Sequence, residues 1–348
     1  MPDPMMPPAA HLHVHLESAI RWSTLADLAA ANGVANPPRD HRFASFAEFF
    51  DRNHLVRECL RRPADFRRVA VEFCADQVAE GVRYVEVSFT AAAHGERLGD
   101  LDMPLAATID GLAEGGERHG LAWRVILDTS RRRSVDRAWR TLDLARRHPE
   151  VVAVGLAGDE DHPAAPFAAV FAAARDAGLH VVHHAGEAAG PASIREALDA
   201  GGAERLGHGI RVLDDPDLVA EVRERAIPLE VCPSSNVALG FVPSLAAHPL
   251  PRLHAAGLRV TLNTDIPAMI GTTLPTEYAA AARTFGWTPR DEAKEGPLPI
   301  AQAIGRGPSF ADLARASVDA SFADDRTRSR LTDAIAAWEA AGTGLPPG

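Results

Sequence analysis

The sequence has few cysteines and no long apolar run, and these two absences exclude several classes of protein. Only Cys59, Cys74 and Cys232 occur among 348 residues, and they form no C-x-x-C pair. A disulfide framework and a thiolate zinc ribbon are therefore not expected. No run approaches 18 apolar residues, and residues 1–10 contain neither a basic segment nor an apolar one. We therefore expect no membrane span, no signal peptide and a cytoplasmic location.

Basic residues are outnumbered, and lysine is nearly absent. Lys294 is the single lysine, and 36 basic residues face 47 acidic ones, which gives a net charge of −11. Proteins that bind the nucleic-acid backbone neutralise its phosphates with a basic surface, so we expect no nucleic-acid partner. A small nucleoside is not excluded as a substrate. Hydrophobic residues make up 46% of the chain, enough for a sizeable buried core.

Glycine-rich phosphate-binding loops are also missing, which disfavours the nucleotide-binding types of doubly wound sheet. The sequence contains instead an alternation of short Val-, Leu- and Ile-rich runs with longer segments of helical period. The eight short runs are candidate strands: His11–Leu16, Arg83–Phe89, Ala122–Asp128, Val151–Ala157, His180–His184, Arg205–Gly209, Ile227–Cys232 and Arg259–Asn263.

Seven segments between these runs have a helical pattern: Asp65–Gln77, Ala106–Arg118, Val135–Arg147, Ala164–Asp176, Pro191–Ala200, Asp215–Arg225 and Leu245–Ala255. Strands that alternate with helices pair in parallel. Eight such units predict an α/β fold, a (β/α)₈ TIM-type barrel with extra C-terminal helices, and an open doubly wound sheet is the alternative.

The predicted barrel covers about residues 10–285 of a single domain, 1–348. An excursion and closing helices follow over about residues 286–341. The excursion, 289–308, is rich in proline, glycine and charge and is interpreted as a lid or as a surface loop. Phe310–Phe322 and Thr327–Ala341 are the two predicted closing helices.

Histidine and acidic side chains stand at the ends of four candidate strands. They lie in His11-Leu-His13-Val-His15, His183-His184-Ala-Gly-Glu187, Gly207-His208-Gly209 and Asn263-Thr-Asp265. Each motif alone fits a polar strand end, a turn histidine or a helix N-cap. Together they mark strands 1, 5, 6 and 8, whose C-terminal ends converge on one face of a closed barrel, where such barrels hold their active sites. Imidazoles and a carboxylate suit Zn²⁺ or a similar divalent ion, so we predict a metal site there.

Other polar residues have no informative spacing. Ser234, Ser235 and Asn236 are interpreted as residues of the rim or of a helix cap, and His94 and His248 as surface or core histidines. Cys232 is interpreted as a small buried residue rather than a nucleophile.

Six motifs carry a resemblance to a known family: His13-Val-His15-Leu-Glu17, Leu156-Ala-Gly158-Asp-Glu160, His184-Ala-Gly-Glu187, Arg205-Leu-Gly-His208-Gly209, Glu230-Val-Cys-Pro-Ser-Ser-Asn236 and Asn263-Thr-Asp265. Their types and order, from about residue 10 to residue 280, resemble the adenosine/adenine deaminase family of the amidohydrolase superfamily. The stretch Leu229–Tyr278 resembles the bacterial branch that contains aminodeoxyfutalosine deaminases.

The resemblance implies a metal-dependent hydrolase that releases ammonia from a 6-aminopurine nucleoside or a related amino-heterocycle. It implies that one Zn²⁺ per chain, or another divalent metal, is held by His13, His15, His184 and Asp265. It further implies that Glu187 delivers a proton to the ring nitrogen and that His208 lies beside the attacking water. Asp265 would accept the water proton, and the Gly158 N–H would face the purine N3.

Two positions depart from the family pattern. Ile266 stands where the family has a second Asp that bonds N7 of the purine, and Ser18 stands where a Gly follows Glu17. An unpaired buried polar group costs about 1–3 kcal/mol, so a purine N7 facing Ile266 would be disfavoured. We predict that Glu17, Ser18, Gly158 and Ile266 bind substrate. Two interpretations stay open: a substrate with an apolar edge, such as a 7-deazapurine, or a modified adenosine, such as aminodeoxyfutalosine, with Ile266 as tolerated drift.

Two alternative functions remain. One is an amidohydrolase that cuts another C–N bond, and the position of Glu187, suited to protonating a ring nitrogen, disfavours it. The other is a catalytically silent nucleoside-binding paralogue, which would need neither Glu187 nor His208. A homo-oligomer is compatible with the sequence.

Overall fold

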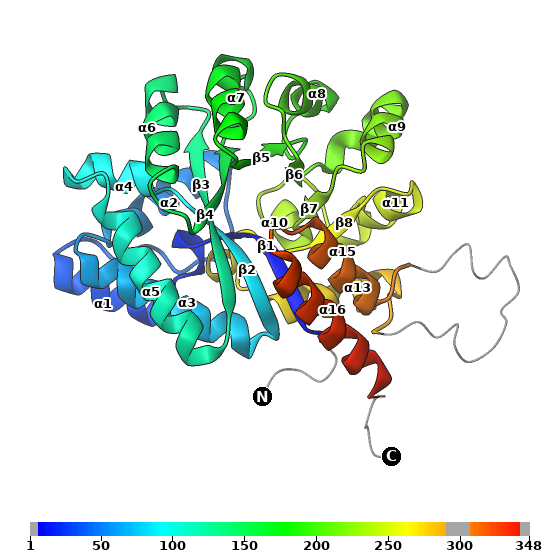
Figure 1. Cartoon of the computed structure of the whole chain (residues 1–348), viewed down its shortest axis with the longest axis horizontal. Helices are drawn as coiled ribbons and strands as arrows, with labels where there is room; N and C mark the ends of the chain where they lie inside the picture. Colours follow the sequence, from blue (N-terminus) through cyan, green and yellow to red (C-terminus); the bar gives the residue numbers. More distant parts are fainter. Residues whose placement is uncertain (1–5, 290–306, 342–348) are drawn as a thin grey trace, which may run out of the picture.

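A computed structural model describes residues 6–289 and 307–341 and contains one sheet of eight parallel strands, ordered β1 to β8 (Figure 1). The strands are β1 (Ala9–His15), β2 (Val82–Phe89), β3 (Ala122–Ser130), β4 (Val151–Ala157), β5 (His180–Ala185), β6 (Arg205–His208), β7 (Leu229–Val231) and β8 (Val260–Leu262). Each overlaps one of the eight candidate strands. The prediction of a (β/α)₈ barrel is therefore confirmed, and the open doubly wound sheet is not observed.

The barrel closes between its first and last strands through the residues that follow β8. Val14 forms an isolated parallel bridge with Asp265. The Asp265 N–H donates to the His13 carbonyl over 2.9 Å, and the His15 N–H donates to the Asp265 carbonyl over 2.9 Å. Residues 250 positions apart in sequence thereby become neighbours at the C-terminal end of the barrel.

Helices surround the strands. The α-helices are α1 (Trp22–Asn32), α2 (Phe46–Glu58), α3 (Pro63–Ala79), α4 (Ala91–Leu98), α5 (Met103–His119), α6 (Val135–Ala145), α7 (Ala168–Asp176), α8 (Pro191–Asp199), α9 (Pro216–Glu224), α10 (Pro233–Ala238), α11 (Leu250–Ala255), α12 (Pro267–Ile270), α13 (Leu274–Phe285), α15 (Phe310–Ala320) and α16 (Asp325–Ala340). The short 3₁₀ helices are η1 (Glu17–Ala19), η2 (Ala165–Phe167), η3 (Ile210–Asp214) and η4 (Leu245–Ala247).

All seven helical segments predicted between the strands are present, but two are divided. The segment Ala164–Asp176 begins as η2 and continues as α7. The segment Leu245–Ala255 is divided into η4 and α11, and Pro249 lies at the break. Proline has no N–H to donate, so it begins a helix more readily than it continues one. The helices α1, α2, α4, α10, α12 and α13 are additional to the prediction. The first four share a connection with a predicted helix, and α12 and α13 follow β8, where none was predicted before residue 310.

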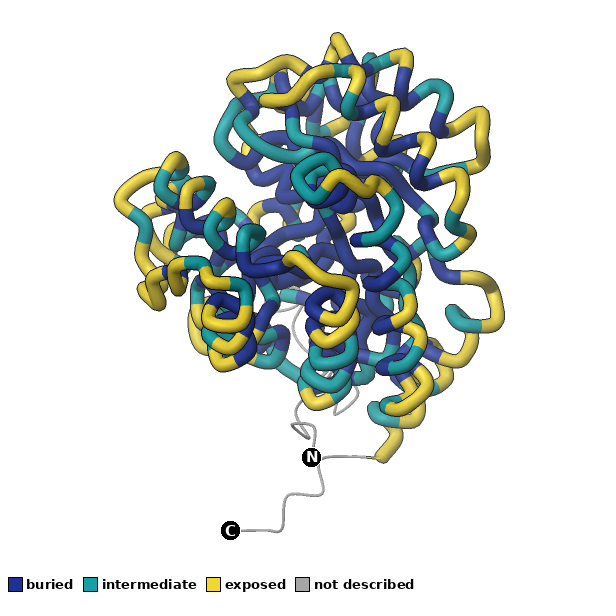
Figure 2. The backbone as a smooth tube through the Cα atoms, turned by 90° about the vertical axis from the view of Figure 1, so that its left-hand side faces the viewer, coloured by how far each residue is buried: buried dark blue, intermediate teal, exposed yellow. Residues whose placement is uncertain are grey.

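The two C-terminal helices complete the wall of the barrel, as the sequence predicts. Apolar residues of α15 and α16 pack against Ala10 and Leu12 of β1, in a cluster that includes Val318 and Ile335. The helix α15 thus lies over both β8 and β1 (Figure 1). Figure 2 shows the strands buried at the centre and exposed residues concentrated on the outer turns of the helices. Residues 290–306 of the predicted excursion lie outside the described residues.

Phe322 covers the N-terminal end of the barrel. Its ring stacks on His180, the first residue of β5, with centroids 3.9 Å apart. The guanidinium of Arg205, the first residue of β6, lies 3.9 Å from the centre of the same ring. A larger cavity opens at the opposite, C-terminal end.

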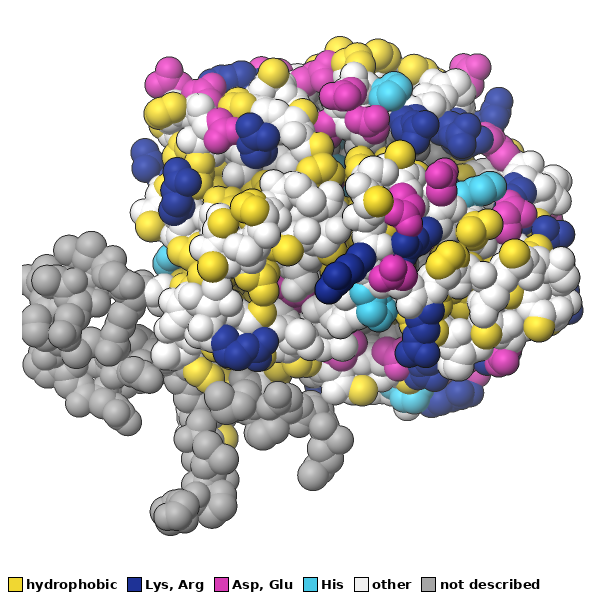
Figure 3. Space-filling model, turned by 180° about the vertical axis from the view of Figure 1, so that it is seen from behind, with side chains coloured by type: hydrophobic (Ala, Val, Ile, Leu, Met, Phe, Trp, Pro, Cys, Tyr) yellow, Lys and Arg dark blue, Asp and Glu magenta, His cyan; other side chains and the backbone are white. Residues whose placement is uncertain are grey.

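The described surface has mixed charge. In Figure 3, basic and acidic side chains alternate with hydrophobic ones over the face opposite to that of Figure 1. Within residues 6–289 and 307–341, no helix combines the length and the apolar character needed to cross a membrane.

Candidate metal centre and active site

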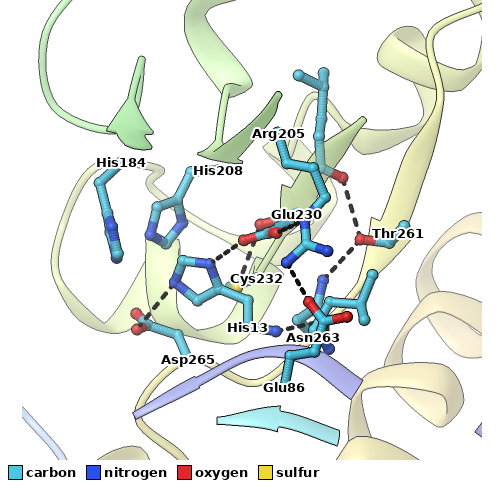
Figure 4. Close-up of polar contacts among 12 residues, drawn as sticks. His13, Glu86, His184, Arg205, His208, Glu230, Cys232, Thr261, Asn263 and Asp265 are labelled. Carbon is cyan, nitrogen blue, oxygen red and sulfur yellow. Dashed lines mark hydrogen bonds and ion pairs between the residues drawn. The ribbon is translucent and has the colours of Figure 1, made fainter. Parts of the chain in front are cut away.

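Four buried side chains converge at the C-terminal end of the barrel. His13, His184, His208 and Asp265 each offer one ligand atom, and these atoms lie within 4.8 Å of one another (Figure 4). His15 is a fifth member, because its Nε2 lies 3.3 Å from Nε2 of His184 and 3.2 Å from Oδ1 of Asp265. The structure therefore brings together all four predicted metal ligands and His208.

The cluster fits a divalent metal. Imidazole nitrogens and a carboxylate are a donor set that Zn²⁺ prefers. The Nε2 atoms of His13 and His208 are buried and have no hydrogen-bond partner. A buried polar atom is costly when unpaired, so a ligand in this space would satisfy both. Burial opposes a charge on His13, but Asp265 and Glu230 outweigh it and raise its pKa to about 9, which shows a local field that favours a cation.

Carboxylates orient the two histidines of β1. Nδ1 of His13 lies 2.7 Å from Oε2 of Glu230, which accepts its proton. Nδ1 of His15 lies 3.3 Å from Oδ2 of Asp128 at the end of β3. A carboxylate at Nδ1 holds the proton on that nitrogen and leaves the Nε2 lone pair free for a metal. Both rings therefore present Nε2 to the cluster.

An ion-pair chain supports Glu230 from inside the barrel (Figure 4). Arg205 lies 2.6 Å from Glu230 and 2.6 Å from Glu86, and all three side chains are almost fully buried. Burial opposes the charge of Arg205, but these two carboxylates raise its pKa above the ordinary value. The pairing keeps Glu230 ionised and fixed in place, so it can accept the His13 proton.

Two residues of the cluster have a left-handed backbone, which is rare outside glycine. His208 has φ 64° at the end of β6, and Asp265 has φ 61° after β8. Such a conformation costs about 1–3 kcal/mol and persists only where the surroundings enforce it. The Ser235 hydroxyl fixes Asp265 by donating to Oδ2 over 2.5 Å. Gly207 must lack a side chain, because a Cβ there would lie 2.8 Å from the His13 ring.

Glu187 follows β5 in a loop that Glu160 organises. The Glu160 carboxylate accepts the backbone N–H groups of Gly186 (2.7 Å), Glu187 (2.8 Å) and Ala188 (2.9 Å), and the hydroxyl of Ser193 (2.5 Å). Glu187 is buried, and its Oε1 lies 3.3 Å from Nε2 of His208. Burial, and then the charges of Asp265 and Glu160, raise its pKa well above the ordinary value. Both effects favour the neutral carboxylic acid over the carboxylate.

A chain of hydrogen bonds assigns the tautomer of His208. The Leu250 N–H donates to Nδ1 of His248 over 3.0 Å, so the proton of His248 is on Nε2. That Nε2 donates to Oδ1 of Asn236 over 3.1 Å, and the Asn236 amide N–H then donates to Nδ1 of His208 over 3.1 Å. Burial lowers the pKa of His248 to about 4, and burial together with His13 lowers that of His208 to about 3. Neutral His208 therefore carries its proton on Nε2, which faces the cluster.

A cavity of about 400 Å³ opens onto the cluster, a size typical of sites that hold a small organic ligand. His15, His184, Glu187, His208 and Asp265 form its inner end. Gly158 lines it after β4, with φ 100°. The helix α2 and the turn between β3 and α6 form its outer wall.

A family model described as adenosine deaminase matches residues 8–296. The chain belongs to the adenosine deaminase family. It is 36% identical to an adenine deaminase from Streptomyces coelicolor over 333 residues, which cover 93% of each protein. It is 38% identical to an aminodeoxyfutalosine deaminase from Acidothermus cellulolyticus over 304 residues, 81% of this chain and 84% of the relative.

Two solved structures have the same fold as this chain. An adenine deaminase from Arthrobacter aurescens superposes with a TM-score of 0.85 at 30% identity, over 95% of this chain and 99% of that one. An amidohydrolase from Burkholderia ambifaria with bound zinc superposes with a TM-score of 0.78 at 25% identity, over 96% and 94%. This member of the adenosine deaminase family is therefore a metal-dependent aminohydrolase.

The cavity of this deaminase does not include every residue predicted to bind substrate. Glu17 is buried in η1, where it accepts the Thr90 N–H over 3.1 Å and lies 3.2 Å from Nε2 of His94. Ser18 is buried beside it, and its hydroxyl has no partner. Neither lines the cavity. Of the four predicted residues, Gly158 alone is at the cavity surface.

Ile266 also lies behind the cavity wall. It is 1% exposed and belongs to an apolar cluster with Phe49, Leu239 and Met269. Phe49 and Leu239 line the cavity. This part of the cavity wall is thus apolar, and Ile266 lies behind it.

Sequence reasoning missed several residues around the deaminase site. Asp128 ends the third candidate strand at the same barrel face as the four motifs, and that position was the available signal. Glu160 lies within one of the six motifs that resemble the family. No sequence pattern indicates that its carboxylate accepts three successive backbone N–H groups. His248 is buried, in agreement with the interpretation as a core histidine, but no sequence signal indicates its bond to Asn236. The cavity-lining residues of α2, from Phe46 to Arg57, were also missed. Their spacing of three and four residues, which is typical of one face of a helix, was the available signal.

Proposed function

We propose that this aminohydrolase removes the exocyclic amino group from a 6-aminopurine nucleoside, or a related amino-heterocycle, in a zinc-dependent hydrolysis that releases ammonia. The observation that carries the proposal is the buried acid Glu187, which shares one cavity with the histidine–aspartate cluster. A site that only held a metal would not need a neutral carboxylic acid beside it.

His13, His15, His184 and Asp265 would hold the zinc. Zn²⁺ in such a site supplies Lewis acidity that makes water a nucleophile near neutral pH. Asp265 accepts the proton of the attacking water, because the neighbouring imidazoles of His13 and His15 outweigh the effect of burial and keep its carboxylate ionised, with a pKa well below the ordinary value. The water oxygen bonds to the amino-bearing ring carbon.

Glu187 completes the addition by giving its proton to the adjacent ring nitrogen, which receives the displaced electron pair. His208 stabilises the developing negative charge on the attacking oxygen through its Nε2 proton. The C–N bond then breaks: the amino group leaves as ammonia with the proton held by Asp265, the hydroxyl proton passes to the Glu187 carboxylate and restores its acid form, and the ring keeps the oxygen as a carbonyl. The Gly158 N–H would position the base at N3.

The substrate differs from plain adenosine at its N7 edge. Phe49 and Leu239, with Ile266 behind them, give an apolar wall that cannot bond a ring nitrogen. An amino-heterocycle with an apolar edge, such as a 7-deazapurine, or a modified adenosine bound with a different tilt, fits this wall. Aminodeoxyfutalosine belongs to the second class, and one relative is named for deaminating it.

The test is ammonia release by zinc-loaded protein, with the ultraviolet spectrum of the base followed in parallel. Adenosine, adenine, aminodeoxyfutalosine, 7-deazaadenosine and a pterin form the panel. We expect ammonia from at least one, and none after Glu187→Gln, while Glu224→Gln on the exposed face of α9 acts as the control. If folded, zinc-loaded protein releases ammonia from no member of the panel, the proposal is contradicted. Hydrolysis of another C–N bond, or a catalytically silent paralogue, is then favoured.

Leu239→Asn tests the substrate class, because Leu239 lines the cavity whereas Ile266 lies behind its wall. If the apolar edge selects the substrate, this variant turns over adenosine faster than the parent protein. Loss of activity on every aminopurine, with thermal stability retained, would contradict the role assigned to the apolar wall.

A further inference from the structure

The outer wall of the cavity is formed by one face of α2. Phe46, Phe49, Phe50, Asn53 and Arg57 all line the cavity, and their spacing of three and four residues places them along a single stripe. The stripe is aromatic at its N-terminal end, where Phe46, Phe49 and Phe50 lie. It is polar at its C-terminal end, where Asn53 and Arg57 lie. A ligand along this wall would meet apolar rings and then hydrogen-bond donors.

Arg57 lacks the partner that a partly buried arginine requires. Its Nε is buried and has no acceptor among residues 6–289 and 307–341. Among the described residues, no carboxylate lies within ion-pair distance of its guanidinium, although most arginines nearby are paired, such as Arg137 with Glu96. The Oδ1 of Asn53, one turn earlier on the stripe, is also buried without a partner. Arg57 and Asn53 both line the cavity, where the other guanidinium N–H groups and the amide NH₂ group can donate to a ligand.

Two further cations lie opposite this stripe. Arg132 and Arg133, in the turn between β3 and α6, both line the cavity. In the part of the chain that the structure describes, neither forms an ion pair, and the Arg132 guanidinium lies 5.4 Å from the centre of the Phe50 ring. Burial lowers the pKa of Arg57 overall; the charge of Glu17 raises it, and the charges of Arg133 and Arg137 lower it, so these cations act on one another. Although the whole protein has a net charge of −11, unpaired positive charge is concentrated at the mouth of this cavity.

We propose that this wall binds an oxyanion, a carboxylate or a phosphate monoester, on the substrate at the end remote from the amino group, with Arg57 and Arg133 as its specificity determinants. Phe46, Phe49 and Phe50 cover the apolar part of the substrate between that anion and the heterocycle. Guanidinium groups recognise both oxyanions through paired N–H donors, so the two share one chemistry. The inference rests on the proposed deamination, because it names the class of substrate for the same site.

The test compares ligands that differ only in charge at the ribose 5′ end. Adenosine 5′-carboxylate and its neutral 5′-carboxamide have matched shapes, and adenosine and adenosine 5′-monophosphate complete the set. Dissociation constants of the corresponding inosine compounds, measured by calorimetry on zinc-loaded protein, provide a readout that needs no turnover. The variants are Arg57→Gln and the more exposed Arg133→Gln, and Arg328→Gln on α16 is the control.

We expect the carboxylate or the phosphate to bind at least about tenfold more tightly than the neutral amide, and the stronger of the two identifies the anion. Arg57→Gln should weaken the anionic ligand by about 10- to 100-fold and the neutral one by less than threefold. Added salt should weaken only the anionic ligand. Equal binding of carboxylate and carboxamide, or equal losses for both in the Arg57 and Arg133 variants, would overturn the inference.

The two proposals fail separately. If ammonia is released without any preference for an anion, the deaminase proposal stands and this inference is wrong. If no member of the set releases ammonia but anionic ligands bind through Arg57, the oxyanion site stands and the deaminase proposal is wrong.

Discussion

The backbone N–H of Asp265 donates to the carbonyl of His13 over 2.9 Å, and this bond joins the end of the barrel to its beginning. The two side chains meet in the same place, with His13 Nε2 3.5 Å from Asp265 Oδ1. Closure of the fold and assembly of the metal centre are therefore one event. A chain that failed to close the barrel would also fail to form the site.

Glu230→Gln should weaken metal binding. A neutral amide still fits between His13 and Arg205, but it no longer holds the His13 proton on Nδ1 with a charge. Loss of such a supporting carboxylate typically costs 10- to 100-fold in metal affinity, and we expect a loss of about that size. Competition for zinc with a chelator of known affinity measures it, and Glu224→Gln is the matched control. An unchanged affinity would show that Glu230 does not orient His13.

Asn236→Asp should reverse the tautomer of His208. A carboxylate can only accept, so His208 would place its proton on Nδ1 and turn a bare nitrogen towards the cluster. We expect kcat to fall by about 10²–10⁴, while the zinc content and KM change little. Nitrogen chemical shifts of His208 report the tautomer directly. Activity within threefold of the parent, with the tautomer reversed, would remove His208 from the chemistry.

Activity should decline as pH rises through the pKa of Glu187. The proposed step needs this carboxyl protonated, and burial with Asp265 and Glu160 raises its pKa well above the ordinary value. Its acid form is therefore present below the raised pKa and is lost above it. A profile of kcat/KM against pH should show this alkaline limb. A flat profile up to pH 10 would mean that another group supplies the proton.

Ionisation of Glu80 should lower the free energy of unfolding of the protein as pH rises. Burial outweighs a hydrogen bond from the Leu274 N–H and raises the pKa of Glu80 from 4.5 to about 7. The unfolded chain releases this proton near pH 4.5 and the folded chain only near pH 7, so stability falls between these values and then levels. Glu80→Gln removes this loss, and we expect it to gain about 1–3 kcal/mol over the parent between pH 4.5 and pH 8.

Urea unfolding of the parent protein and of Glu80→Gln, at pH 4.5 and at pH 8, measures this difference in the free energy of unfolding. Glu117→Gln, on the exposed face of α5, controls for the removal of one carboxylate. If the difference between parent and Glu80→Gln is the same at both pH values, Glu80 is ionised in the folded protein throughout the range.

Local sequence pattern was sufficient for the strands and for most of the predicted helices. Short β-branched runs and amphipathic segments follow the periods of 2 and 3.6 that burial imposes, so they are visible in sequence. The break at Pro249 and the extra helices α1 and α2 were not visible, because they lie in connections where tertiary packing decides the conformation. The identity of the metal and the roles of the site residues remain predictions.

The sequence alone determined which side chains end the strands of the barrel, and hence that three histidines and an aspartate would share one face. Only the tertiary structure decided what surrounds them. Glu230 and Asp128 orient the histidines, Glu160 holds the Glu187 loop, and Ile266 stands behind the cavity wall rather than in it. The reason is physical: strand ends are set by local periodicity, whereas hydrogen bonds between residues far apart in sequence exist only once the barrel has closed.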